Sequence, residues 1–423
     1  MTAANVVASL GDFRRATLPR LADALAAAAA ASLPWSTSAT GILVALWLVA
    51  SLPTLDIAAL RREVQSAPGG LPVLLVALAL AGLARSEAPL PELVRGIEPF
   101  LRLLMIPVLF AQFRRSEHSM WVGAAFLASG TVLLTLAWTM FWMHLDFGHG
   151  PGVPVKDYIT QSGVFALCAF ALIHIAVDRW IERRRLPAVI AGVLAFLFIA
   201  NIVYVTTSRT TLVVILALLP VFALQRSSWQ ALVGIVLAGL VVAGAVWATS
   251  PYVRMRVTSV AGEIAESEAR ETSSGSRLGF WKNSLIVLRE APIFGHGTGM
   301  IGEAFRRHPE LNSGPPAVNP HNQVFTIGIQ LGAVGIAALI AMWAAHWSMF
   351  LRPGLAAWAG LMAVTQNIVG SLFNSHLMDF TQTWIYVFAV GVFGAAVLPR
   401  RAAAEPEDSP HFPPSPSPSP PSR

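Results

Sequence analysis

Long apolar runs separated by short polar segments recur along almost the whole chain. A transmembrane helix needs about 20 predominantly apolar residues, and a window of about 19 residues finds twelve such segments. The pattern therefore predicts an all-α polytopic membrane protein with about twelve transmembrane helices. The predicted spans lie near residues 21–34, 36–54, 71–84, 96–113, 119–142, 158–178, 186–206, 209–226, 229–249, 322–350, 353–373 and 380–399.

Composition supports lipid rather than water as the main surroundings. The 423 residues are 55% hydrophobic and only 12% charged, whereas a soluble domain carries about 25% charged residues. The single cysteine, Cys168, excludes an internal disulfide and a zinc site of clustered thiolates. The net charge of +6 is typical of basic cytoplasmic loops in a membrane protein, so it does not indicate nucleic-acid binding.

Arginines and lysines in the short loops predict the orientation. With both termini in the cytoplasm, fifteen of these residues lie inside and four outside, which satisfies the positive-inside rule. The inside set is Arg14, Arg15, Arg20, Arg61, Arg62, Arg114, Arg115, Arg179, Arg183, Arg184, Arg185, Arg226, Arg352, Arg400 and Arg401, and the outside set is Arg85, Arg95, Lys156 and Arg209.

One connection is much longer than the others. Residues 250–321 join the ninth and tenth predicted spans on the outer side, and loops of this length usually have a function. Within this loop, Leu278, Trp281, Leu285 and Leu288 recur at helical spacing after Ser276, a suitable N-cap. They predict an amphipathic helix over 277–290. The expected divisions are residues 1–249 with nine spans, the outer loop 250–321, 322–400 with three spans, and a disordered Pro/Ser-rich cytoplasmic tail at 401–423.

Three polar positions converge on the predicted outer face. Arg209 follows Ser208 at the start of the eighth span, and Arg277 begins the loop helix four residues before Trp281. Either arginine alone also fits a surface charge whose side chain reaches the lipid head groups. His321 lies in Asn319-Pro-His-Asn322, where Asn319 suits an N-cap and places His321 in the first helical turn. A helix N-terminus favours neutral imidazole, the form of a general base, although such a histidine can also simply help the chain to turn.

Two other motifs favour structure over chemistry. The glycines of 292–299 resemble a phosphate loop only weakly, because the Lys-Ser/Thr pair is absent, and a tight turn is the simpler interpretation. His144, Asp146 and His149 offer metal-binding atoms without a standard zinc spacing. We therefore expect neither a metal nor a cofactor.

In order and spacing, these motifs resemble those of the O-antigen ligase and polymerase family. The resemblance rests on Ser208-Arg209, Arg277 with Trp281, Pro292 to Gly297, and His321-Asn322. It covers roughly residues 200–340 in detail, and the predicted spans with one large outer loop match in outline. The family is of GT-C type.

The resemblance implies a periplasmic active site in the bacterial inner membrane. Family members use glycans carried on undecaprenyl diphosphate, and the ligases transfer them to a sugar hydroxyl of the lipid A–core, which completes lipopolysaccharide. His321 matches the family's essential histidine, and Arg209 and Arg277 match its essential arginines. Polymerases share much of this pattern, so polymerase or a related lipid-linked glycosyltransferase is the alternative.

The residues fit that chemistry. Arginine presents a permanent charge and a planar fork to phosphate oxygens, and His321 can take the proton of the acceptor hydroxyl. Two arginines can replace a divalent metal, so we expect metal-independent, inverting transfer. Weaker candidates for substrate binding are Arg102, Trp281, Asn322, Tyr158 and Gln161.

A transporter is the alternative from another class. Twelve spans with both termini inside is a common transporter layout, with binding residues near the middle of the membrane. Here the polar residues gather at one face, and the two halves show no convincing repeat.

Overall fold

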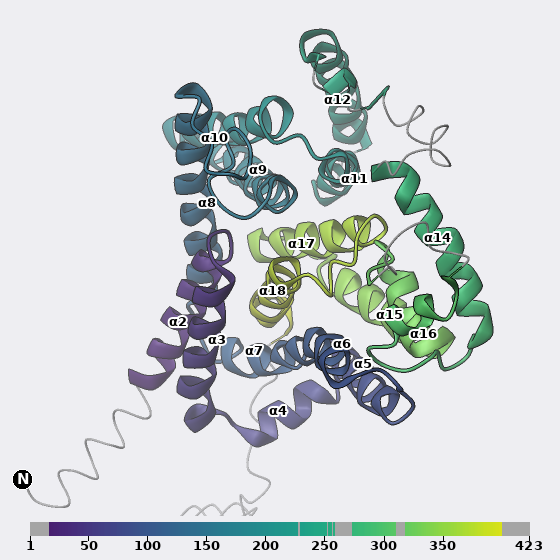
Figure 1. Cartoon of the computed structure of the whole chain (residues 1–423). Helices are drawn as coiled ribbons and strands as arrows, with labels where there is room; N and C mark the ends of the chain where they lie inside the picture. The colour runs from purple at the N-terminus through teal and green to yellow at the C-terminus, as the bar shows by residue number, and fades with distance from the viewer. Residues whose placement is uncertain are drawn as a thin grey trace, which may run out of the picture.

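The computed structural model describes residues 17–226, 229–251, 253–255, 257–258, 273–309 and 318–399, and every regular element in them is helical (Figure 1). The α-helices are α2 (Leu18–Ser32), α3 (Thr37–Ser51), α4 (Ile57–Val64), α5 (Ala67–Leu83), α6 (Leu90–Arg102), α7 (Met105–Phe113), α8 (Ser119–Trp142), α9 (Tyr158–Ile181), α10 (Arg185–Tyr204), α11 (Arg209–Gln225), α12 (Trp229–Thr249), α14 (Ser273–Glu290), α15 (Ile301–Arg306), α16 (Gln323–Met349), α17 (Leu355–Ser371), α18 (Phe380–Phe388) and α19 (Gly394–Val397). A 3-10 turn, η2 (Leu52–Thr54), follows α3, and a π-helical turn, η4 (Ala389–Phe393), joins α18 to α19.

The expected class of protein, an all-α polytopic membrane protein, is confirmed for the described part of the chain. Helices occur in all twelve predicted segments. Among the described residues, however, only six helical segments are long and apolar enough to cross a membrane, or seven if the bent pair α4 and α5 is one span. The count of twelve spans is therefore not confirmed.

The predicted span 96–113 is not one helix, and proline explains the difference. It is divided into α6 and α7, with a break at Leu103 and Leu104. Pro107 has no N–H to donate to the carbonyl of Leu103, and its ring would collide with that carbonyl in a continuous helix. Instead, the Leu103 carbonyl accepts from Ile106 in a tighter turn.

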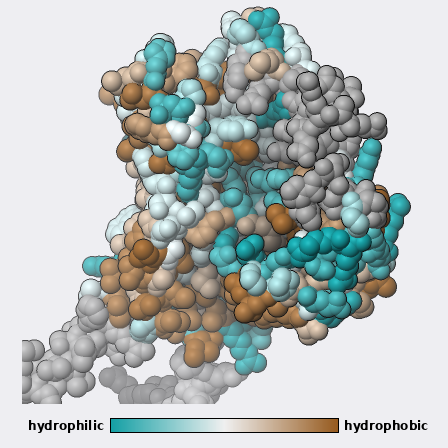
Figure 2. All heavy atoms as spheres, viewed as in Figure 1, coloured by the Kyte–Doolittle hydropathy of each residue, from teal (hydrophilic) through white to brown (hydrophobic). Residues whose placement is uncertain are grey.

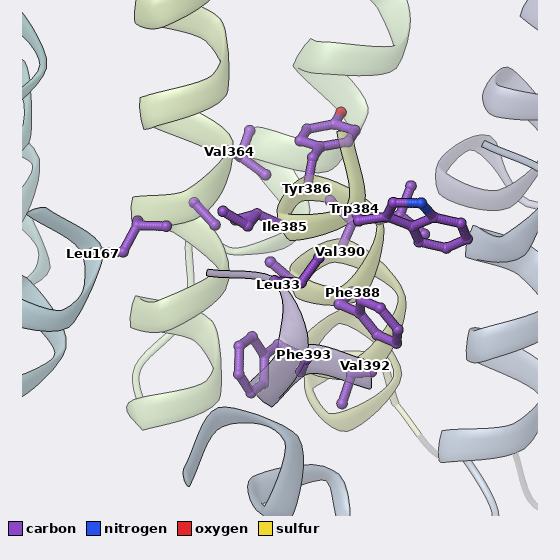
Figure 3. Close-up of a cluster of buried hydrophobic side chains, with 14 of the residues drawn as sticks. Leu33, Leu167, Val364, Trp384, Ile385, Tyr386, Phe388, Val390, Val392 and Phe393 are labelled. Carbon is purple, nitrogen blue, oxygen red and sulfur yellow. The ribbon is translucent and has the colours of Figure 1, made fainter. Parts of the chain in front are cut away.

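The centre of the molecule is formed by α18, η4 and α19 (Figure 3). Of the segment Phe380–Val397, 83% is buried, against 28% of the most apolar part of α8. In Figure 3, Ile385, Phe388 and Val390 from this segment lie among side chains from other helices, including Leu167 and Val364. Because most of α18 is buried among other helices, the turn that precedes it is supported by packing.

The outer helices present apolar side chains to the surroundings. Ile42, Leu46 and Val49 of α3 are all exposed, and Figure 2 shows hydrophobic atoms over α2, α3 and α7 but hydrophilic atoms over α14 and α15. A soluble protein rarely exposes such continuous apolar surface. These surfaces are those of a multi-pass membrane protein.

Helix α16 is kinked at Gly332, and the glycine-rich turn 292–299 fits into the kink. Gly332 has φ +64°, a conformation that only glycine adopts easily. The kink leaves the carbonyls of Ile329 and Gln330 to accept from the N–H groups of His296 and Gly297, at 2.8 and 3.0 Å. This insertion fixes the end of α14 against α16.

The predicted loop helix is present as α14, with two corrections. It begins at Ser273, three residues before the predicted N-cap Ser276. Its buried positions are Ser284 and Val287, whereas Leu285 of the predicted apolar stripe is 41% exposed. The buried stripe is rotated by about one residue because α14 packs against α16 as well as facing outward; in Figure 1 it runs along the edge of the molecule beside α15 and α16.

Candidate functional site

The candidate site is built around the turn between α17 and α18, which we call the α17–α18 turn (Leu372–Asp379). Asp379 ends it as the N-cap of α18 and accepts the Gln382 N–H at 2.8 Å. The His376 ring packs so closely on Gly370 that a side chain at Gly370 would overlap it. The turn is therefore held from both sides by the helices it joins.

The start of α16 is bound to this turn by four side chains. Asn322 donates to the carbonyl of Leu372 at 3.0 Å, and Gln323 accepts the N–H of Leu377 at 2.9 Å. The Ser375 hydroxyl lies 2.7 Å from both Thr326 Oγ1 and Asn319 Oδ1. These bonds connect segments about fifty residues apart in sequence.

His321 lies at this junction but not where the sequence predicted. The N-cap is Asn322, whose side chain accepts from Val324 and Phe325, so His321 precedes the helix rather than lying in its first turn. Its φ is +53°, unusual for a residue other than glycine. Asn319, the predicted N-cap, instead accepts the His321 N–H at 2.9 Å, and Pro320 between them cannot compete as a donor.

Asn374 orients the imidazole of His321. The distance from His321 Nδ1 to Asn374 Oδ1 is 3.2 Å. An amide oxygen only accepts, so Nδ1 must carry the proton, and the neutral ring then has its lone pair on Nε2. The contact with Asn374 therefore favours the tautomer that has its proton on Nδ1.

Helix α14 brings Trp281 to the same turn. The Trp281 ring lies 6.5 Å from that of Phe373, and the Phe280 ring lies 5.8 Å from that of His321. Leu372, Phe373 and Asn374 thus contact Asn322, Trp281 and His321 in that order. Arg277 is in α14, one helical turn before Phe280 and Trp281, but its side chain lies outside the described residues.

Arg209 begins α11, as predicted. Ser208 is the N-cap and accepts the Thr211 N–H, and the Arg209 side chain is half-buried. The next two residues, Thr210 and Thr211, line a small cavity together with His376 of the α17–α18 turn. Arg209 and His321 therefore lie at the same end of the helices, on segments that both adjoin this turn.

Among the weaker candidates, Arg102 contacts the start of α18, and Tyr158 and Gln161 lie in the first turn of α9. The Arg102 guanidinium stacks on the ring of Phe380 at 4.8 Å and pairs with Glu98 at 2.6 Å. Its Nη1 is buried without a hydrogen-bond partner among the described residues. Gln161 donates to the carbonyl of Gly152, and Tyr158 begins α9.

Two further charged groups, neither predicted, adjoin the start of α18. Lys156 Nζ donates to the carbonyl of Leu33 at 2.5 Å and to Thr381 Oγ1 at 2.8 Å. Burial lowers the pKa of Lys156, and burial raises the pKa of the Asp379 carboxyl. Both shifts mean that the charged forms are poorly solvated, so the field of an ionic substrate is weakly screened here.

The glycine-rich turn does not form a phosphate cradle. The N–H groups of His296 to Gly299 bond to protein acceptors: the carbonyls of Ile329, Gln330 and Gly82 and the side chain of Gln330. This confirms a structural turn. In the segment that contains His144, Asp146 and His149, where no metal was expected, Asp146 Oδ1 accepts the N–H groups of Gly148 and Gly150. Within the described ranges, no three His, Cys, Asp or Glu side chains are grouped as for a metal ion.

Sequence reasoning missed Asn374 and Ser375 and misread Asn319. The signal was the polar run Asn374-Ser-His376, followed by Asp379, which interrupts the apolar pattern between the last two predicted spans. These residues are more than fifty positions away from His321, and only the packing of α16 against the turn shows that they meet.

The fold is that of a helical multi-pass membrane protein with a polar site at one end of its helices. Residues 194–340 match the family model described as O-antigen ligase. This stretch runs from α10 into α16 and contains Arg209, Arg277 and His321. This match confirms, for residues 194–340, the resemblance to the O-antigen ligase family seen in the motifs.

A curated relative adds similarity over a short stretch. A protein described as uncharacterized from Haemophilus influenzae (strain ATCC 51907 / DSM 11121 / KW20 / Rd) is 40% identical over 81 residues. The match covers 18% of this chain and 20% of the relative, so the chain spans only a fifth of that protein's length. This similarity carries no further information about function.

Proposed function

We propose that this protein is an O-antigen ligase that transfers a glycan from undecaprenyl diphosphate to a sugar hydroxyl of lipid A–core. The observation that carries the proposal is the bond from His321 Nδ1 to Asn374, within the region that matches the family. It gives the neutral ring a lone pair on Nε2, as a general base requires.

The reaction then follows from single-displacement chemistry. His321 Nε2 takes the proton of the acceptor hydroxyl while its oxygen attacks the anomeric carbon. The bond from that carbon to the phosphate oxygen breaks, and undecaprenyl diphosphate leaves with the bonding electrons. Attack from the side opposite the leaving group inverts the anomeric configuration. Asn374 keeps the ring in the orientation and tautomer that this step needs.

Arginines are proposed to bind the diphosphate. Arg209 and Arg277 supply permanent charge to its oxygens, as the resemblance implies, and the buried Arg102 Nη1 is a donor without a protein partner among the described residues. Trp281, Asn322, Tyr158 and Gln161 are proposed as further substrate contacts. Because arginines supply the positive charge, transfer should continue in excess chelator. Loss of activity on chelation, with recovery on adding magnesium or manganese, would contradict this part.

The proposed setting is the bacterial inner membrane, with both termini in the cytoplasm and the active site facing the periplasm. In this scheme residues 250–321 form a periplasmic loop that contributes to the active site. Cysteines introduced singly at Ser274 and Ser313 in a Cys168→Ala background should react with an impermeant thiol reagent from the periplasmic side. Labelling only from the cytoplasmic side would reverse the topology.

The direct test is transfer by purified protein with a lipid-diphosphate glycan and lipid A–core, followed by mass analysis of the products. Ligase activity yields lipid A–core extended by the glycan. If the donor glycan itself becomes longer, the protein is a polymerase. Uptake of the glycan lipid into vesicles without any new glycosidic bond would instead favour a transporter.

A further inference from the structure

A second cavity lies on the other side of the residues that hold His321. It has a volume of about 170 Å³ and lies between α6 and the segment that contains α15. Residues from five segments line it, among them Arg95 and Gly96 of α6, Gly299 and Gly302 around α15, and Gln330 of α16. A cavity of this size accommodates about one sugar ring with its bound water.

The wall nearest the candidate site is formed by Asn319 and Thr326. Asn319 accepts the His321 N–H at 2.9 Å, and both Asn319 and Thr326 lie 2.7 Å from the Ser375 hydroxyl. A molecule in this cavity is therefore separated from His321 by one layer of side chains.

Most polar groups in the cavity are already bonded to the protein. Glu92 pairs with Arg306 at 2.9 Å, and Gln330 uses Oε1 on the Gly299 N–H and Nε2 on the Thr326 carbonyl. Arg95 differs from them: its side chain is exposed, and within the described ranges it forms no hydrogen bond or ion pair. Its five N–H groups can all be directed to a ligand.

The cavity is built from close backbone contacts. A side chain on Gly96 would lie 2.5 Å from Cα of Gly299, and one on Gly302 would lie 3.2 Å from Glu92 Oε2. Helix α6 and the α15 segment thus approach as closely as glycine allows. Contacts this close leave the two segments little room to move, which reduces the entropy lost on binding.

From these observations we infer that this cavity binds the acceptor saccharide and that Arg95 pairs with a phosphate or carboxylate carried by that saccharide. The inference rests on the proposed function and adds a binding site to it. An anionic sugar fits because a guanidinium forms its strongest pairs with such groups. The anionic sugar would lie behind the layer formed by Asn319 and Thr326, and the rest of the acceptor would reach His321 around that layer.

The test is steady-state transfer by Arg95→Ala with the donor and the acceptor varied separately. We expect KM for the acceptor to rise by about 10- to 100-fold, as is typical for loss of a charge-assisted pair. The kcat and KM for the donor should change by less than about threefold, because Arg95 takes no part in the chemistry. Arg95→Lys should recover part of the acceptor affinity, since it keeps the charge but loses the fork.

Arg307→Ala is the matched control. Arg307 lies at the end of α15 and is exposed, but it is paired with Glu87 at 2.6 Å. It also carries the same charge, so a general loss of positive potential would affect both variants. The acceptor KM of Arg307→Ala should stay near that of the wild type.

A second arm tests whether Arg95 binds an anionic group of the acceptor. With an acceptor stripped of phosphate and with its carboxylates reduced, wild type and Arg95→Ala should have the same acceptor KM. An unchanged acceptor KM in Arg95→Ala, or a rise in the donor KM instead, would overturn the inference while transfer by wild type still supported the proposed function. Absence of any transfer by wild type would reject the proposed function itself.

Discussion

Helices α9 and α11 each have polar side chains at both ends. At one end of the pair these side chains adjoin the candidate site, and at the other end they bond to one another. At the end opposite the candidate site, which we call the Asp23 end, the charges pair with one another. Arg226, at the C-terminus of α11, bonds Asp178 of α9 at 2.6 Å and stacks on Trp358 at 4.0 Å. Asp23 accepts from Gln112 at 2.7 Å and Ser116 at 2.6 Å and lies 3.0 Å from His118 Nδ1.

At the candidate site, some buried polar atoms lack a hydrogen-bond partner among the described residues. The buried Arg102 Nη1 and Trp281 Nε1 have no partners in the described part of the chain, and neither does His376 Nδ1. Buried polar atoms are normally satisfied, but the Asp23 end also has such atoms: Arg226 Nε, His174 Nε2 and Gln225 Nε2 lack partners among the described residues. The difference between the ends lies in the charged side chains: Arg226 of the Asp23 end forms an ion pair within the protein, whereas Arg209 and Arg277 are proposed to bind the substrate.

The largest expected effect is that of His321→Ala. Removal of a general base should lower kcat by about 10²- to 10⁴-fold. The side chain is half-buried and precedes the helix, so the variant should insert, purify and bind the lipid-diphosphate donor like wild type. Transfer rates and donor binding measured on the same preparations check this.

Asn374→Asp tests the same base through its pH dependence. A carboxylate beside His321 stabilises the imidazolium, so the acidic limb of the rate profile should move to higher pH.

Near-normal transfer by a well-folded His321→Ala protein would return this histidine to a structural role, and the arginines alone would then have to account for catalysis.

Arginines at the two ends of α11 provide the next test. Arg209→Ala should weaken donor binding as well as turnover, by about 10- to 100-fold in kcat/KM, because the diphosphate is charged before and during the reaction. Arg277→Ala should behave in the same way, and lysine at either position should restore only part of the activity.

Arg226→Ala is the control from the Asp23 end. It leaves Asp178 without its partner and should lower the free energy of unfolding by about 1–3 kcal/mol, without changing the kcat/KM of the folded protein. Equal losses of donor affinity in Arg209→Ala and Arg226→Ala would show that the two ends do not differ in function.

Asp23→Ala should affect stability only. It leaves Gln112, Ser116 and His118 without their shared acceptor, and Asp23 is only 2% exposed. Loss of such an acceptor costs about 1–3 kcal/mol, which thermal unfolding in detergent would measure. The transfer kinetics of the protein that remains folded should equal those of wild type.

Periodicity and local capping signals predicted most of the helices. Every segment predicted from an apolar run contains a helix in the structure, and Ser208 is the N-cap of α11, as predicted. The predictions that went wrong depended on competition between neighbours. Asn319 and Asn322 are both good N-caps, and the choice of Asn322 follows from its second bond, to Leu372 in the α17–α18 turn.

The candidate site was predicted by residue type but not by arrangement. His321, Arg209 and Trp281 carry chemistry that a sequence displays directly. In the sequence, Asn374 looks like any loop residue, and only the packing of the helices shows that it contacts His321. Arg95 differs from other surface arginines only because no residue in the described structure pairs with it. Tertiary contacts of this kind have no local signal.

The last expected effect concerns pH and His376, at the candidate-site end. Burial lowers the pKa of His376 to about 4 from the usual 6.5. Between these values the unfolded chain binds a proton that the folded protein excludes, so this contribution to stability is complete above about pH 6.5 and is lost as the pH falls toward 4. At its steepest the loss is about 1.4 kcal/mol per pH unit for one proton. His376→Gln removes the titrating group, so its unfolding temperature should fall less than that of wild type between pH 7 and 5. Equal falls in the two proteins would mean that His376 is hydrated and accepts a proton in the folded state, and the α17–α18 turn would then be open to water without a substrate.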